Sequence, residues 1–406
     1  MDHRLLDPDR ADRAARIRRD RPGHPLAERR PGGHRHRVRR RARADPPRAA
    51  SESERAVNGV DAGPRTIAWR CRGLSLRFRL RTVVVCSVFG GVVLALALLA
   101  LCLGDLPLSV GEVASAFLRG QGDLVQTVVL EWRLPPVIAA VLFGAALGLS
   151  GAIFQSLTRN PLASPDIIGL TAGSYAGGLV MIILVGAGAG SAVVAGGAIG
   201  GGLIAAALVY VLAYRRGIQG FRLIVVGIGV SAMLQALSSY LVLRAKLEVA
   251  MLASVWGAGS LNSVGWAHLL PAAAVIAVVV IALGTLGGSL RQLELGDDAA
   301  KALGSRVERS QLGLVACAVV LTAVVTGAAG PIAFVALAAP QIAQRITRTA
   351  GIALVPSALL GAVVLLASDI VAQHVLPTSL PVGVVTVVVG GCYLIWLLIH
   401  EVRRRR

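Results

Sequence analysis

Long runs of uncharged, mostly apolar residues follow one another along the chain after residue 81. A charge is costly in hydrocarbon, and about 20 apolar residues are enough for a helix to cross a membrane. Uncharged runs therefore measure candidate membrane spans. Eight runs of this length occur, at residues 82–104, 134–158, 167–214, 223–243, 249–290, 310–344, 349–368 and 370–400. The pattern predicts an all-α polytopic membrane protein.

Two of the long runs in the first half must be divided. Residues 167–214 have room for two helices, because a glycine-rich turn can separate them. Residues 249–290 begin with a broken, amphipathic part, which leaves one full span near 266–287. In residues 167–214 the turn is predicted at Gly186, Gly188 and Gly190.

Proline and glycine divide the second half in the same way. Gly330-Pro331 and Pro340 interrupt residues 310–344, which predicts one full helix before Gly330 and a shorter one after it. A turn from Pro377 to Pro381 separates the last two spans. The total is about ten transmembrane helices.

The distribution of basic residues predicts the topology. Cytoplasmic loops of membrane proteins are enriched in Lys and Arg. Both ends of this chain are basic, so both termini are predicted to be cytoplasmic, which requires an even number of spans. After residue 82, the predicted inner segments hold 14 basic residues and the outer loops hold four, Arg119, Arg133, Arg244 and Lys246.

Composition supports this class and excludes others. The chain has 406 residues, of which 55% are hydrophobic and 16% charged; soluble domains carry about 25% charged residues. The net charge of +19 is concentrated in residues 1–82, which hold 23 of the 41 basic and 10 of the 22 acidic residues. A soluble enzyme, or a nucleic-acid-binding domain built on the whole chain, is therefore not expected.

The first 80 residues form a basic tail with few large apolar groups, and such a segment is predicted to be disordered. Three interpretations are open. The tail is an over-extended translation start, a basic arm on anionic lipid, or a nucleic-acid arm. We favour the first, because the body at residues 81–406 is complete without the tail.

Catalytic chemistry has no candidate in the sequence. A phosphate-binding loop needs a lysine after a glycine-rich turn, and Lys246 and Lys301 both have non-glycine neighbours. The five cysteines are scattered with no metal-ligand spacing, so we predict no cofactor and no metal site. Asp369 is the clear charge inside a predicted span. A proton pump or ion-coupled carrier usually has more ionisable residues inside its membrane spans.

Two predicted cytoplasmic loops carry the most specific residues. In residues 157–169, Asn160-Pro161 and Pro165-Asp166 stop one helix and start the next, and Asp166 suits the first turn of that next helix. Residues 291–309 are the longest internal charged segment. There Asp297-Asp298 predict the start of a short helix that ends at Gly304. Such a helix is either a docking element for a soluble partner or a solvent-exposed connection between two spans.

The motifs of the body fall into a recognisable order. They are Arg133-Leu134-Pro135; Gly144-Ala145-Ala146; Ser150-Gly151-Ala152 with Gln155; Arg159-Asn160-Pro161 to Asp166 with Gly169; Gly227; Trp256-Gly257 with Gly259-Ser260-Leu261; Leu295-Gly296-Asp297 with Ala300 and Leu303-Gly304; Gly330-Pro331-Ile332 with Phe334 and Pro340; Asp369; and Leu380 to Thr386. From about residue 83 to 400 the sequence resembles the permease subunit of the ferric-siderophore, haem and vitamin B12 class of bacterial ABC importers. Residues 166–169 look more like the siderophore branch.

This resemblance implies a type II ABC importer permease in the bacterial plasma membrane, with residues 81–406 as the permease domain. It implies a cytoplasmic ATPase dimer, an extracytoplasmic substrate-binding protein and a second permease, identical or a sister subunit, as partners, and no nucleic acid. The implied site residues are a coupling loop at Gly296, Asp297, Asp298, Ala300, Leu303 and Gly304; a cytoplasmic loop at Arg159, Asn160, Pro161 and Asp166; binding-protein docking at Arg133; and a gated path at Gly151, Gln155, Gly330, Pro331, Pro340 and Gln341.

Departures from the family pattern leave alternatives open. Pro136, Gln341 and Gln373 stand where the family usually has arginine, histidine and arginine. The replaced arginines favour a heterodimer with a sister permease. Beside the ferric-siderophore importer, we keep a haem or vitamin B12 importer within the same family, and a secondary carrier or channel for a small solute. A membrane-embedded enzyme comes last, because no catalytic constellation is present.

Overall fold

The fold is a bundle of helices, seen in a computed structural model that describes residues 66–71, 74–118, 124–186, 190–213, 220–349, 351, 353–375 and 378–405. The tail up to residue 65 and the predicted positions Arg119, Gly188, Arg215, Arg216 and Pro377 lie outside the described residues. The elements in chain order are β1 (Thr66–Cys71), β2 (Leu74–Arg79), α2 (Leu80–Cys102), α3 (Val110–Leu118), α4 (Leu124–Thr127), η2 (Val128–Arg133, a π-helical segment), α5 (Leu134–Thr158), α6 (Leu170–Val185), α7 (Ser191–Ala213), α8 (Gly220–Arg244), α9 (Leu247–Gly257), α10 (Trp266–Glu294), α11 (Asp297–Ala302), α12 (Val307–Ala329), α13 (Val335–Thr347), α14 (Leu354–Ile370), η3 (Val371–Val375, also π-helical) and α15 (Val382–Arg405).

Each predicted span corresponds to a helix. The uncharged run at residues 134–158 coincides with α5, and the broken segment that begins at residue 249 overlaps most of the short helix α9. In the part of the chain that the structure describes, seven helices are long and apolar enough to cross a membrane. Helices α6 and α13 are shorter, and the apolar part of α15 is Val382–Trp396. The total of ten spans stays a prediction.

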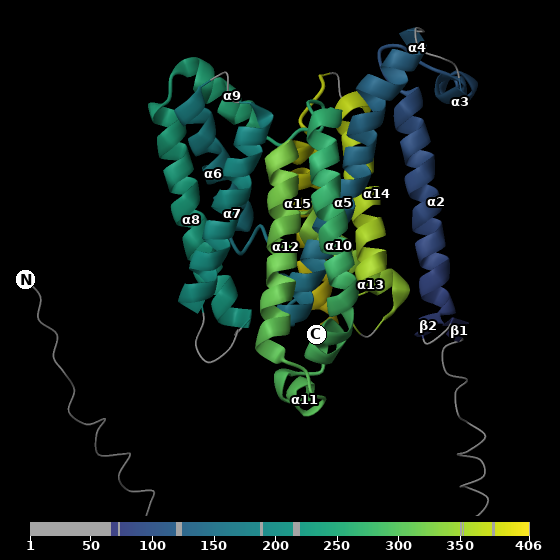
Figure 1. The fold of residues 1–406 in the computed structure, drawn as a ribbon, viewed down its shortest axis with the longest axis vertical. Coiled ribbons are helices and arrows are strands. Elements are labelled where there is room, and N and C mark those ends of the chain that lie inside the picture. The colour runs from purple at the N-terminus through teal and green to yellow at the C-terminus, as the bar shows by residue number, and fades with distance from the viewer. Residues whose placement is uncertain are drawn as a thin grey trace, which may run out of the picture. The chain divides into compact units, whose positions relative to one another are not determined.

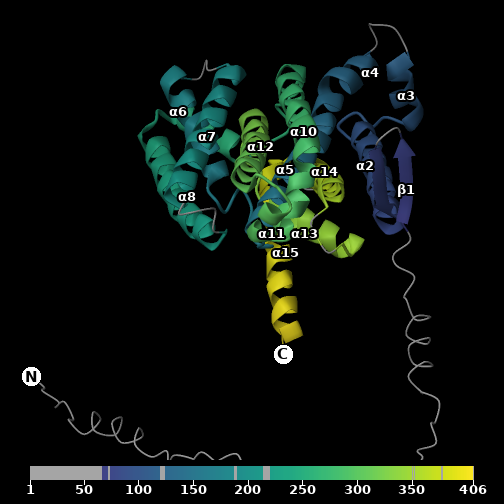
Figure 2. The ribbon, with the colours of Figure 1, turned by 60° about the horizontal axis from the view of Figure 1, so that its bottom comes forward.

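The two ends of the bundle carry different parts of the chain. The start of α2, the short helix α11 and the C-terminal end of α15 lie at one end, and α3 and α4 lie at the other (Figure 1; Figure 2). A chain that enters and leaves at the same end crosses the bundle an even number of times. This is the arrangement that the basic residues predict, and the side of the membrane that each end faces stays a prediction.

The segment just before α2 differs from the sequence expectation. Residues 66–79 were predicted to be part of a disordered tail, but β1 and β2 pair as an antiparallel ladder from Thr66 opposite Arg79 to Cys71 opposite Leu74. Apolar and polar residues alternate along residues 74–79, and this period of two favours a strand. Residues 66–79 are thus paired in the structure, and the division into a tail at residues 1–80 and a permease domain at residues 81–406 stays a prediction.

Helix α5 lies at the centre of the bundle because glycine lets neighbouring backbones approach it closely. It packs against α10, α12, α13 and α14. A Cβ atom on Gly144 would overlap the backbone of Gly361, and one on Gly148 would overlap the carbonyl of Ser357. Lipid supplies no hydrophobic drive for helix association, so such close van der Waals contact stabilises the pair instead. Helices α6 and α7 meet in the same way at Gly173, Gly177, Gly197 and Gly201.

We predict that Gly148→Ala lowers the thermal stability of the purified protein, because the added methyl group overlaps a backbone oxygen of α14. Overpacking of this kind costs about 1–3 kcal/mol. The matched control is Gly284→Ala in α10, where a Cβ has nothing within 4 Å. The measurement is the apparent melting temperature in detergent. A Gly148→Ala protein as stable as the control would contradict the packing argument.

Candidate functional site

The predicted short helix on the charged loop is confirmed as α11. Gly296 precedes it with φ 115, Asp297 and Asp298 occupy its first turn, and Gly304 follows its end with φ 83. Carboxylates in a first turn interact favourably with the helix dipole. Ala300 is fully buried, whereas Leu303 is 58% exposed. The helix is therefore anchored on one face and presents an apolar side chain to its surroundings on the other.

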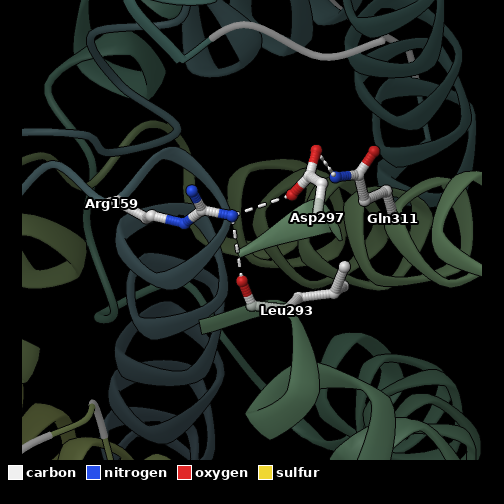
Figure 3. A network of polar contacts seen from close by, with 4 residues as sticks. All are labelled: Arg159, Leu293, Asp297 and Gln311. Carbon is white, nitrogen blue, oxygen red and sulfur yellow. Dashed lines mark hydrogen bonds and ion pairs between the residues drawn. The ribbon is translucent and has the colours of Figure 1, made fainter. Parts of the chain in front are cut away.

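Figure 3 shows that Arg159, at the end of α5, joins this helix to the other predicted loop. The Arg159 guanidinium donates to the Leu293 carbonyl at 3.1 Å and pairs with Asp297 Oδ1 at 2.8 Å. Gln311 Nε2 donates to Asp297 Oδ2 at 3.3 Å. Both members of the ion pair are half exposed, and such a pair contributes about 1 kcal/mol or less. The network fixes the direction of α11 more than it adds stability.

A second contact, one turn earlier in α5, joins the same two segments. Ser156 Oγ donates to Glu294 Oε1 at 2.8 Å, and Glu294 is the last residue of α10. Arg159 itself has φ 51, the left-handed conformation that ends α5. Sequence analysis considered the loops at 157–169 and 291–309 as separate candidate sites. In the structure, contacts of Ser156 and Arg159 join them.

The loop after Arg159 turns back toward the bundle. Asn160 Oδ1 accepts a hydrogen bond from the Leu162 amide at 2.9 Å, which is the side-chain-supported turn typical of asparagine before proline. Pro161 is exposed. The loop is thus ordered by its own sequence up to Ala163, as Asn160-Pro161 predicted.

The prediction that Asp166 lies in the first turn of the next helix is wrong, because α6 begins at Leu170. Gly169, with φ 88, delays the start of the helix. Asp166 instead accepts two hydrogen bonds, from Thr171 Oγ1 at 2.6 Å and from the Phe334 amide at 3.1 Å. Burial raises the pKa of the Asp166 carboxyl, and both hydrogen bonds oppose that rise.

The contact with Phe334 matters because that residue, which immediately precedes α13, is in the left-handed conformation with φ 67. Such a φ is costly for a residue with a Cβ unless its surroundings hold it. Asp166 is one of those surroundings, although 168 residues separate the two positions. The sequence carries no signal of this pairing.

Four residues of the predicted gated path meet between α5 and α13. Gln155 Nε2 donates to the Leu337 carbonyl at 3.0 Å, and Gln341 Nε2 donates to Gln155 Oε1 at 2.7 Å. A Cβ on Gly151 would overlap the carbonyl of Ala336. Pro340, inside α13, has no amide hydrogen, so it cannot donate the regular helix hydrogen bond to the Ala336 carbonyl. Gln155 and Gln341 are 1% and 7% exposed, so here they are packed and do not line an open path.

The remaining two path residues lie elsewhere. Gly330 ends α12 with φ 76, and a Cβ on it would overlap the Trp256 carbonyl. Its neighbour Pro331 lies against Gly259, and the Ser260 amide donates to Ala329 at 2.8 Å. Gly330 and Pro331 therefore belong to a junction with the α9–α10 connection and are separate from the glutamine pair.

Arg133 and Asp369 are both engaged within the chain. The Arg133 guanidinium donates to the carbonyls of Leu101 at 2.8 Å and Leu106 at 2.6 Å, at the end of α2. These bonds use two of its five N–H groups. Asp369, which is buried, accepts a hydrogen bond from Gln373 Nε2 at 2.7 Å. Docking of a partner at Arg133 stays a prediction.

Comparison with known proteins matches most of the chain. A model of the FecCD transport family matches residues 92–400. The ferric enterobactin transport system permease protein FepG of Escherichia coli (strain K12) is 48% identical over 80% of this chain and 98% of its own. The iron(3+)-hydroxamate import system permease protein FhuG of Bacillus subtilis (strain 168) is 35% identical over 78% and 97%. A solved inward-facing conformation of a metal-chelate type ABC transporter matches with a TM-score of 0.68 and 26% identity, covering 79% of this chain and 99% of its own.

We predict that Asp166→Ala destabilises the protein by about 1–3 kcal/mol, because it leaves the Phe334 amide without its acceptor. Asp166→Asn should cost less, since its side-chain oxygen can still accept that bond. Melting temperatures in detergent measure the difference, and Asp298→Ala on the exposed face of α11 is the control. Equal stability of the alanine variant and the control would show that the contact with Phe334 does not stabilise the protein.

Proposed function

Because the chain belongs to the FecCD transport family, we propose that it is the permease through which an ATP-driven importer moves ferric siderophores across the plasma membrane. The observation that carries this proposal is the 48% identity to a ferric enterobactin permease across almost all of that protein. The second relative, a permease for iron–hydroxamate, supports the same class of substrate. Family members are permease subunits of ABC importers and are not themselves enzymes.

ATP hydrolysis takes place in a separate cytoplasmic subunit. This chain has two lysines, Lys246 and Lys301, and neither follows a glycine-rich turn that could hold phosphates. We assign docking of that subunit to α11 and its flanks, Gly296 to Gly304. The exposed Leu303 is suited to enter a pocket on the partner, and the buried Ala300 anchors the helix to the permease.

The other partners follow from the family. A substrate-binding protein docks at the opposite end of the bundle, near Arg133, and a second permease, identical or a sister subunit, completes the path. No role in nucleic-acid binding is proposed. The glutamine pair and the Gly330-Pro331 junction are assigned to gating, and rigid-body movement of helix groups alternates access to the path.

We predict that the chain restores uptake of iron-loaded enterobactin in a strain that lacks its own permease but keeps the matching ATPase and binding protein. Uptake of radioactive iron, with an iron–hydroxamate chelate as the comparison substrate, is the measurement. ATP-depleted cells serve as the control. Accumulation that persists without ATP would favour a secondary carrier over an ABC importer.

We predict that Leu303→Asp abolishes recovery of the ATPase subunit with the purified permease, because it places a charge in the proposed pocket. The side chain is exposed, so folding should be unaffected. Leu118→Asp in α3 is the matched control, since Leu118 is 87% exposed at the opposite end of the bundle. Normal recovery of the ATPase with Leu303→Asp would remove Leu303 from the docking surface.

A further inference from the structure

One continuous segment, from Gly151 in α5 to Asp166 in the following loop, contacts both the proposed docking helix and the start of α13. We infer that this segment, called here the linkage (residues 151–166), passes displacement of α11 to the first two turns of α13. The inference rests on the proposed function, because it assigns α11 to the ATPase. It adds the route by which force applied there reaches α13, which carries the proposed gating residue Gln341.

The lower part of the linkage holds the α10–α11 junction through three contacts, one on α11 and two on the end of α10. Arg159 pairs with Asp297 at 2.8 Å and donates to Leu293, and Ser156 donates to Glu294 at 2.8 Å. The acceptors belong to the last two residues of α10 and the first residue of α11. A force that tilts α11 therefore acts directly on the end of α5.

The upper part of the linkage holds α13 along one face. Gln155 contacts Leu337 and Gln341 through its two amide atoms, and the Gly151 backbone lies against Ala336. Asp166 holds the Phe334 amide just before the helix. These contacts extend from residue 334 to residue 341, so they hold the first two turns of α13 together against α5.

Those two turns of α13 lack one helix hydrogen bond. Pro340 removes the amide that would bond the Ala336 carbonyl, which loosens the helix at that point. Upstream, Gly330 with φ 76 and Phe334 with φ 67 break the backbone between α12 and α13. Residues 335–341 thus follow a bent connector and lack one internal helix hydrogen bond, so their contacts with the linkage contribute more to holding them in place.

A covalent route from α11 to α13 also exists, through α12. That route passes through Gly330-Pro331, where the chain changes direction, and Gly330 is packed against Trp256. The backbone therefore departs from regular helix at this junction between α12 and α13. The linkage bypasses the junction, because α5 runs as one unbroken helix from Leu134 to Thr158. A connected element whose position both sites bias is a physical basis for coupling between those sites.

The test is the number of ferric siderophore molecules imported per ATP hydrolysed, in proteoliposomes that contain the permease with its ATPase and binding protein. Gln155→Met keeps the size of the side chain but removes the bonds to Leu337 and Gln341. We expect at least a tenfold fall in import per ATP, while the ATPase rate and the recovery of the ATPase stay within twofold of wild type. Gln341→Met loses one bond, and the double variant should fall no further than Gln155→Met.

Gln344→Met is the matched control, because it makes the same change one turn along α13 without a hydrogen bond to α5. Unchanged import per ATP in Gln155→Met would overturn the linkage and favour the route through α12. A fall of the same size in Gln344→Met would overturn it too. So would a loss of melting temperature and ATPase recovery that parallels the loss of import, because that pattern shows a structural role. A wild-type complex that imports no ferric siderophore would instead overturn the proposed function.

Discussion

The close approach of the α5 backbone to its neighbours is the constraint on which the rest of the bundle depends. Gly144 and Gly148 bring α5 against α14, and Gly151 brings it against α13. A Cβ at Gly151 would overlap the Ala336 carbonyl and push α13 away from α5, which would lengthen the hydrogen bonds of Gln155 to α13. The buried polar contacts of the site are therefore a consequence of backbone packing, since lipid alone gives helices no reason to associate.

A second constraint is that every peptide group in a low-dielectric region needs a partner. The chain leaves regular helix between Gly330 and Phe334, and two of the freed groups are bonded from elsewhere in the chain. Ser260 donates to the Ala329 carbonyl, and the Asp166 carboxylate accepts from the Phe334 amide. Irregular backbone at such a point is tolerated when protein surrounds it, and it provides the bends that let short helices move separately.

Sequence analysis predicted the features that charge and proline determine. It missed the contacts between residues that are distant in the chain. The uncharged run at 134–158 predicted α5 because a charge or proline borders each end, and Asp297-Asp298 predicted α11 through local capping. Asp166 was assigned to a helix start for the same local reason. Its position depends on Gly169 and on Phe334, and a pairing across 168 residues leaves no periodic or compositional trace. Arg133, predicted from the resemblance to face a partner, also caps α2 within its own chain.

The two ends of the linkage differ in their exposure, and that difference has a mechanical consequence. The bonds of Gln155 are buried, so water does not compete with them. The Arg159–Asp297 pair is 49% and 39% exposed, so solvent screens it. A subunit docked on α11 would cover this pair and exclude water, and the attraction between two charges rises as the effective dielectric falls. The connection between α11 and α5 should then be stiffest when the partner is bound, which is when force has to pass through it.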